Sequence, residues 1–150
     1  MLQNEKILTG NESGSLFLLS PDLSQKTKLT SPTFRNIRHI DYGIDSNKVF
    51  IFSDDFGIYT FDLEKEKICE TTVMEGHLDV MTSVDCLTQK AVILTASLDG
   101  SVRMWDAKNG DCQVLYENTE VDTWAVKYYE VMDKVVIGNE NGDLSVLDYR

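Results

Sequence analysis

The chain has 150 residues, of which 42% are apolar and 26% charged, and its formal net charge is −11. This length suits one domain, and the composition favours a folded chain with a genuine core over a disordered one. With 25 acidic against 14 basic residues and no basic cluster, the sequence lacks the footprint of a phosphate-binding surface, so we expect no nucleic acid among its partners.

Membrane insertion is also not expected. No apolar run reaches the roughly 20 residues that a spanning helix needs, and residues 1–6 lack the hydrophobic core of a signal peptide. The cysteines Cys69, Cys86 and Cys112 are odd in number and lack Cys-x-x-Cys spacing. They indicate reduced packing residues in a cytoplasmic or nuclear protein.

The chain reads as a series of short strands. Apolar or β-branched runs alternate with turns rich in Gly, Asn, Asp and Ser, and no stretch keeps a helical apolar face. In chain order, the predicted strands are 6–9, 15–19, 26–30, 37–42, 49–53, 58–62, 68–73, 81–87, 92–96, 101–106, 112–116, 124–129, 135–138 and 143–148.

These strands repeat with a period of about 43 residues. Glycines that follow a polar turn are spaced by 43, 43 and 42 residues, at Gly14, Gly57, Gly100 and Gly142. Lysines that precede an apolar run are spaced by 42, 42 and 44 residues, at Lys6, Lys48, Lys90 and Lys134. Four antiparallel strands per repeat predict propeller blades, in units 1–32 (partial), 33–75, 76–118 and 119–150 (partial).

The unit at 76–112 resembles a WD40 repeat. It begins with Gly76-His77 and carries Trp105-Asp106 at a family-like separation, whereas Phe61-Asp62 and Leu147-Asp148 replace Trp-Asp in other units. The resemblance implies an all-β fold: a WD40-type β-propeller segment of about 3.5 blades, each a four-stranded antiparallel sheet, in an incomplete ring or open arc.

The resemblance also implies a buried hydrogen-bonded network within this unit. By position, its members are His77, Thr95, Asp99 and Trp105. Such a network is structural, because buried polar groups must be paired and a satisfied network rigidifies a blade. Phe56 and Asn141 are assigned to the position of Asp99 in the flanking units, so we expect no such network there.

We expect no catalytic, cofactor-binding or metal-binding residues. The spacing of His77, Thr95 and Asp99 suits a brace better than a nucleophilic triad. Two histidines and three scattered cysteines have no recognised metal-ligand spacing, and neither Gly-x-Gly-x-x-Gly nor a P-loop occurs.

Partners of WD40-like propellers usually dock where the first strand of each blade begins. Aligned residues there form the candidate partner-binding rim, namely Asn36, Arg38, Val80, Thr82, Asp122 and Trp124. Trp124 is the sharpest candidate, because aromatic residues are frequent hot spots of binding energy. The alternative for Trp124 is packing between blades.

The resemblance therefore implies a non-enzymatic scaffold or adaptor that binds proteins or peptides in a multiprotein complex, without a cofactor. Two alternatives stay open. Residues 147–150 are similar to the Trp-Asp-x-Arg box of cullin–RING ubiquitin ligase substrate receptors. Residues 122–125 are faintly similar to a strand start in WD40-scaffold hydrolases of the diphthine methylesterase-like type.

Divided by the period, the length amounts to about three and a half blades, fewer than a usual ring. The chain is then a fragment of a longer propeller or a truncated product, a partial propeller that another polypeptide completes, or a small irregular closed form. We expect the isolated chain to be marginally stable or self-associating, because an open arc exposes apolar faces and strand edges.

Overall fold

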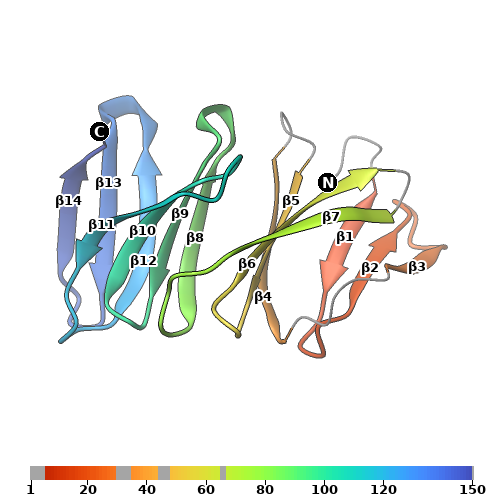
Figure 1. Ribbon diagram of the computed structural model, residues 1–150, viewed down its shortest axis with the longest axis horizontal. Coiled ribbons are helices and arrows are strands. Elements are labelled where there is room, and N and C mark those ends of the chain that lie inside the picture. Colours follow the sequence, from red (N-terminus) through yellow and green to blue (C-terminus); the bar gives the residue numbers. More distant parts are fainter. Residues whose placement is uncertain (1–5, 30–34, 44–47, 65–66, 150) are drawn as a thin grey trace. The chain divides into compact units, whose positions relative to one another are not determined.

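The computed structural model describes residues 6–29, 35–43, 48–64 and 67–149. Its strands form four antiparallel sheets (Figure 1), and the chain divides into two compact units, Met1–Glu75 and Gly76–Arg150. The first unit holds a sheet of β1 (Ile7–Gly10), β2 (Leu16–Leu19) and β3 (Lys26–Leu29), and a sheet of β4 (Ile37–Gly43), β5 (Lys48–Ser53), β6 (Ile58–Glu64) and β7 (Lys67–Met74).

The second unit has the same plan. One sheet contains β8 (Met81–Leu87), β9 (Val92–Ser97), β10 (Ser101–Asp106) and β11 (Cys112–Glu117), and the other contains β12 (Thr123–Tyr129), β13 (Lys134–Asn139) and β14 (Leu144–Asp148). Two short 3₁₀ turns, η1 (Thr88–Lys90) and η2 (Glu130–Met132), join β8 to β9 and β12 to β13. Over the described ranges, no helix has the length and apolar character to cross a bilayer.

The predicted fold class is confirmed. Every predicted strand is present within two residues of its expected bounds, and neighbouring strands within each sheet run antiparallel in chain order. The alternation of apolar and polar residues predicts strands well because successive side chains point to opposite faces of a sheet.

The repeat alignment needs a correction in the first unit. The turn between the second and third strand of each repeat contains one left-handed residue, and these residues are Gly14, Phe56, Gly100 and Gly142, with φ between 68° and 82°. The N–H of Phe56 donates to Ser53 O just as that of Gly100 donates to Ser97 O. Gly57 is therefore one residue away from the position predicted for it, and Asp55, not Phe56, occupies the position of Asp99.

In the series of repeated lysines, Lys90 does not occupy the structural position of Lys48 and Lys134. Lys48 and Lys134 begin β5 and β13, whereas Lys90 ends η1 and is followed by left-handed Ala91. In the next repeat, η2 ends at Met132 and is followed by left-handed Asp133. Lys90 is therefore structurally equivalent to Met132.

The first strand of each of the last three repeats carries a bulge near its start. We call β4, β8 and β12 the leading strands; each has a register irregularity, between Ile37 and His39, Met81 and Ser83, and Thr123 and Ala125. The residue without a cross-strand partner is Arg38, Thr82 or Trp124, respectively. A bulge re-aims the side chain of the extra residue, so the fold gives these three side chains a common special position.

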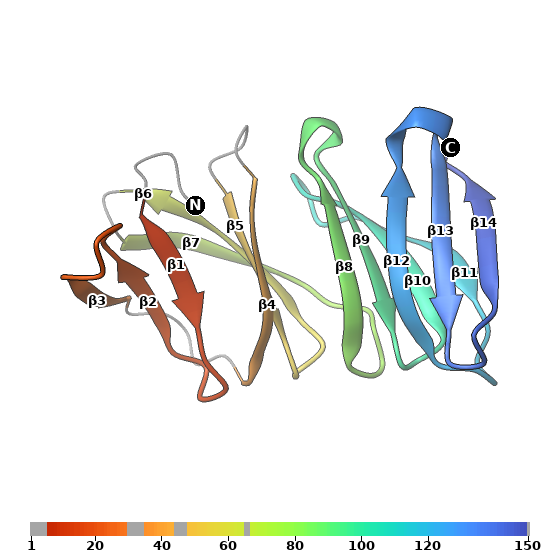
Figure 2. The same cartoon turned by 180° about the vertical axis from the view of Figure 1, so that it is seen from behind.

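The cores lie between neighbouring sheets within each unit. In the first unit, Leu16 and Leu18 of β2 pack with Val49 and Ile51 of β5. Figure 2 shows the two sheets of the second unit, β8–β11 and β12–β14. Leu94, Ala96 and Val102 of one sheet pack with Val126, Val135 and Ile137 of the next. Truncation of such a buried aliphatic side chain to alanine typically costs ~2–5 kcal/mol.

Candidate functional site

The four residues assigned to a buried network lie in one continuous chain of hydrogen bonds. His77 Nδ1 is 2.9 Å from Asp99 Oδ2, and His77 Nε2 is 2.6 Å from Thr95 Oγ1. The indole Nε1–H of Trp105 donates to the same Thr95 oxygen at 2.8 Å. Because that oxygen accepts from the indole, we assign its own proton to His77 Nε2, and the Nδ1–H of His77 then donates to Asp99.

Asp99 is the most heavily hydrogen-bonded member. Besides His77, it accepts from the backbone N–H groups of Leu78 and Ser101, both at 2.9 Å, and from the Ser101 hydroxyl at 2.6 Å. Burial raises the pKa of Asp99, but these hydrogen bonds outweigh it and lower the pKa to about 2. Ser101 was not predicted; its position two residues after an aspartate in a tight turn was the available signal.

The network supports the sheet and offers no reactive group. Burial lowers the pKa of His77, although Asp99 opposes this effect, so the ring is neutral near pH 7. The order Asp99, His77, Thr95 matches that of a nucleophilic triad. However, the Thr95 side chain is fully buried and its oxygen already accepts the indole N–H, so no substrate atom can reach it.

The corresponding turn in the first unit is built differently. Asp55 accepts the N–H of Gly57 at 3.2 Å and the hydroxyl of Tyr59 at 2.6 Å. Burial, and then the hydrogen bond to Asp55, raise the pKa of Tyr59 to about 12. Ile51 replaces Thr95 at the equivalent strand position, so no hydroxyl is present there to join a ring nitrogen.

The rim residues occupy equivalent backbone positions. The carbonyl oxygens of Asn36, Val80 and Asp122 each accept an N–H from the turn that follows the second strand of the repeat, at 3.0 to 3.1 Å. Two residues later lie the bulge residues Arg38, Thr82 and Trp124. The structure therefore aligns the six candidates as the sequence did.

In the first unit, the two rim candidates share one acidic partner. The Arg38 guanidinium contacts both carboxylate oxygens of Asp54, at 2.5 and 3.1 Å, and Asn36 Nδ2 donates to Asp54 at 2.8 Å. The hydrogen bond from Arg38 lowers the pKa of Asp54 despite partial burial. Arg38 remains exposed, but its charge is balanced by Asp54, which lies just after β5.

In the second unit, the rim candidates lie at one end of two packed sheets. The Thr82 hydroxyl donates to the carbonyl of Thr123 at 2.7 Å, which places the two bulges side by side. Val80 and Asp122 are half-buried, whereas the Trp124 side chain is 53% exposed. We call Val80, Thr82, Asp122 and Trp124 the bulge rim.

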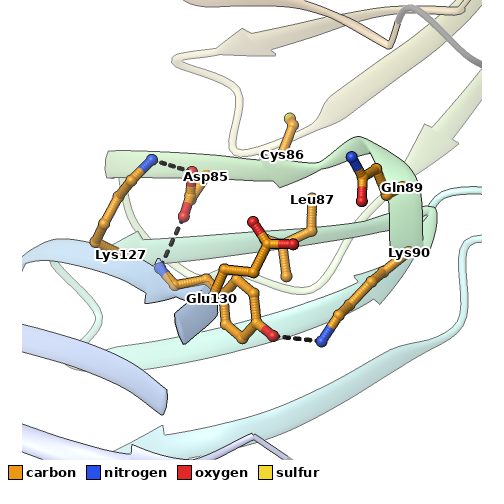
Figure 3. Close-up of a pocket in the computed structure, with 8 residues that line it drawn as sticks. Asp85, Cys86, Leu87, Gln89, Lys90, Lys127 and Glu130 are labelled. Atoms are coloured by element: carbon orange, nitrogen blue, oxygen red, sulfur yellow. Dashed lines mark hydrogen bonds and ion pairs between the residues drawn. The ribbon is translucent and has the colours of Figure 1, made fainter. Parts of the chain in front are cut away.

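A hollow of about 240 Å³ lies in the second unit, near the ends of β8 and β12 that are opposite their bulges (Figure 3). Lys127 Nζ is 2.5 Å from Asp85, whose other oxygen accepts the N–H of Tyr128 at 2.8 Å. Lys90 contacts the Tyr128 hydroxyl and lies 3.1 Å from Asp133. The hollow is lined by Asp85, Cys86, Leu87, Gln89, Lys90, Lys127, Tyr128 and Glu130.

The charges around this hollow join the two sheets. Lys90 Nζ lies 4.4 and 4.1 Å from the ring centres of Tyr128 and Tyr149, which are cation–π distances. The hydrogen bond to Tyr128 raises the pKa of Lys90, and the hydrogen bonds from Tyr128 and Lys90 lower that of Asp133. Sequence analysis missed this cluster because Lys90 is 38 residues from Tyr128 and 43 residues from Asp133.

The residues on which the ligase-receptor and hydrolase alternatives were based lie at 147–150 and 122–125. Arg150, the last residue of the ligase-receptor box, lies outside the described residues, and Leu147 packs against the core of the second unit. Residues 122–125 form the start and bulge of β12. Within the described ranges, no three His, Cys, Asp or Glu side chains cluster in a way that could hold a metal ion.

Comparisons with known proteins find relatives, two of which match about half of the chain. It is 37% identical over 75 residues to the U3 small nucleolar RNA-associated protein 21 homolog of Schizosaccharomyces pombe, and 39% identical over 67 residues to THO complex subunit 6 of Arabidopsis thaliana. These matches cover 50% and 45% of this chain, but only 8% and 18% of the relatives. The chain matches none of the protein-family models compared with it.

The fold has a counterpart among solved structures. The C-terminal WD40 domain of Sif2 superposes with a TM-score of 0.76 at 19% identity, over 95% of this chain and 40% of that domain. At this identity, the likeness bears on the fold alone. It agrees with the sheet plan described above.

Proposed function

Since the chain is a WD40-type β-propeller segment, we propose that it acts as a non-enzymatic scaffold that binds other proteins within a multiprotein complex. The contact surface in this proposal is the bulge rim of the second unit. The fold alone does not define a function, so the proposal depends on the side chains at the rim.

The observation that carries the proposal is the exposure of Trp124 at a bulge. Trp124 is 53% exposed, so much of its apolar surface contacts water. Burial of this surface against a partner would contribute favourable free energy to binding. The backbone beneath it is held in place by the Thr82–Thr123 hydrogen bond and by the paired β13. A rigid aromatic anchor of this kind is typical of interface hot spots.

The names of the relatives support the complex-bound part of the proposal. One relative is named as a subunit of the THO complex, and the other as a protein associated with a small nucleolar RNA. We therefore also propose a nuclear location. The net charge of −11 supports contact with protein components of such assemblies over direct contact with nucleic acid.

Affinity purification with quantitative mass spectrometry tests the proposal. We expect Trp124→Ala to lose at least one partner that the unchanged chain retains. The matched control is Tyr129→Ala, which removes a similarly exposed aromatic from the opposite end of the same strand. If both variants keep every partner, or lose the same partners, the bulge rim is not the contact surface.

A further inference from the structure

The two sheets of the second unit pack face to face through a defined set of side chains. Leu94 and Ala96 of β9 and Val102 of β10 are fully buried, and Met104 is packed beside them. They are covered by the next sheet, which contributes Val126, Val135 and Ile137.

The β12–β14 sheet covers the β8–β11 sheet with one of its faces. Its other face carries apolar residues at the positions equivalent to those that it covers on β9 and β10. Val102 pairs with Ala96 and Met104 with Leu94, just as Leu144 pairs with Gly138 and Val146 with Val136. A Cβ added to Gly138 would lie 3.6 Å from both Ala125 and Leu144, so these residues are contiguous. We call Ala125, Val136, Gly138, Leu144 and Val146 the outer face. Leu144 and Val146 are 75% and 60% exposed.

The first sheet of the chain carries the complementary set. In β13 and β14, the covering residues include Val135, Ile137 and Leu147, and the repeat places Ile7, Thr9 and Leu19 at the same positions of β1 and β2. Leu8, Leu16 and Leu18 alternate with them and pack into the core of the first unit. We call Ile7, Thr9, Phe17 and Leu19 the first-sheet face; each of these residues is only half-buried.

The leading strands β8 and β12 differ in the side chains that anchor a neighbouring leading strand. On β8, the Ser83 hydroxyl accepts the N–H of Val126 at 3.2 Å, and Asp85 accepts that of Tyr128, which anchors β12. The equivalent residues of β12 are Ala125 and Lys127, whose side chains cannot accept a hydrogen bond. The outer face is therefore not equipped to anchor another leading strand. The β1–β3 sheet, as far as the structure describes it, contains none.

We propose that the outer face binds the first-sheet face of a second copy of this chain. The contact repeats, between molecules, the sheet packing seen between β8–β11 and β12–β14. It is heterologous, since different surfaces of the two copies meet. Both copies are acidic, so long-range repulsion opposes the contact, and added salt strengthens it by screening.

Sedimentation equilibrium and light scattering over roughly a hundredfold range of concentration test this inference. We expect the mean mass to rise with concentration and with salt. Leu144→Lys on the outer face and Phe17→Lys on the first-sheet face should each abolish the rise. Lysine reduces the net negative charge, so lost association cannot be attributed to added repulsion. Val131→Lys, at an 85% exposed residue of η2, is the matched control and should associate normally.

Mixing the variants tests the head-to-tail geometry. Leu144→Lys retains an intact first-sheet face and Phe17→Lys an intact outer face, so an equimolar mixture should form heterodimers although neither variant associates alone. Unchanged thermal unfolding must accompany the loss. A monomer at every concentration, self-association that both variants retain, or a mixture that stays monomeric would overturn the proposal.

Discussion

The Oγ1 atom of Thr95 lies 2.6 Å from Nε2 of His77, and this contact continues a hydrogen-bonded chain that begins at Asp99. The same oxygen accepts the indole N–H of Trp105, so one buried hydroxyl satisfies two ring nitrogens. Removal of this hydroxyl by mutation measures its contribution to the free energy of unfolding.

Thr95→Val should lower the free energy of unfolding by ~2–6 kcal/mol. The substitution preserves size and β-branching but leaves His77 Nε2 and Trp105 Nε1–H unpaired, at ~1–3 kcal/mol for each buried polar group. Urea denaturation followed by tryptophan fluorescence measures the change. Thr95→Ser keeps the hydroxyl and should lose less. Equal losses for the two variants would show that packing, not hydrogen bonding, dominates at this position.

Stability should fall as the pH drops below about 6.5. Burial lowers the pKa of His77 from its ordinary value of 6.5, so the unfolded chain takes up a proton before the folded chain does. The contribution of His77 is fully present above pH 6.5 and declines below it, by at most ~1.4 kcal/mol per pH unit. Asp99, whose pKa is lowered from 3.8 to about 2, adds a second decline below pH 3.8.

Midpoints of urea denaturation, measured from about pH 8 to about pH 5, resolve the contribution of His77, because this range spans the titration of histidine. His77→Gln should be less stable overall, and its stability should lack the component that changes with pH below 6.5. If the variant and the unchanged chain show the same slope, the titration belongs to other groups.

Asp85→Ala should destabilise the second unit more than Lys127→Ala does. Loss of Asp85 leaves the Tyr128 N–H without its acceptor at a junction between sheets, at ~1–3 kcal/mol. Lys127 is 75% exposed, and such a surface ion pair contributes ~0–1 kcal/mol. Chemical denaturation ranks the two variants, and hydrogen exchange of the Tyr128 amide should accelerate only in Asp85→Ala. The reverse ranking would contradict the assigned role of the backbone contact.

Gly100→Ala should be far more disruptive than Gly142→Ala. Both glycines have φ near +80°, so a side chain costs ~1–2 kcal/mol of backbone strain at either position. At Gly100, an added Cβ would also lie 2.0 Å from the carbonyl oxygen of Asn118, whereas nothing lies within 4 Å at Gly142. Thermal unfolding measures both variants. Similar losses would mean that the turn after β11 moves aside without cost.

The sequence predicted the strands and the hydrogen-bonded network because both depend on local patterns. It misplaced Phe56 because Gly57 follows it directly, and sequence does not reveal which of two adjacent turn residues becomes left-handed. The hydrogen bond from the Phe56 N–H to Ser53 O decides the position. The Arg38–Asp54 pair and the Lys90–Tyr128 contact, 16 and 38 residues apart, arise from cross-strand and sheet-to-sheet neighbours that periodicity does not reveal.

At the bulges of the leading strands, the side chain of the extra residue is independent of the backbone pairing that holds the sheet together. Arginine, threonine and tryptophan occupy the same unpaired position on nearly the same backbone, and the ladders on either side continue undisturbed. A side chain at such a position can therefore change without breaking a rung of its own sheet's backbone ladder. Under the proposed function, a single substitution at one bulge would alter the partner contacts of one repeat and leave those of the other repeats unchanged.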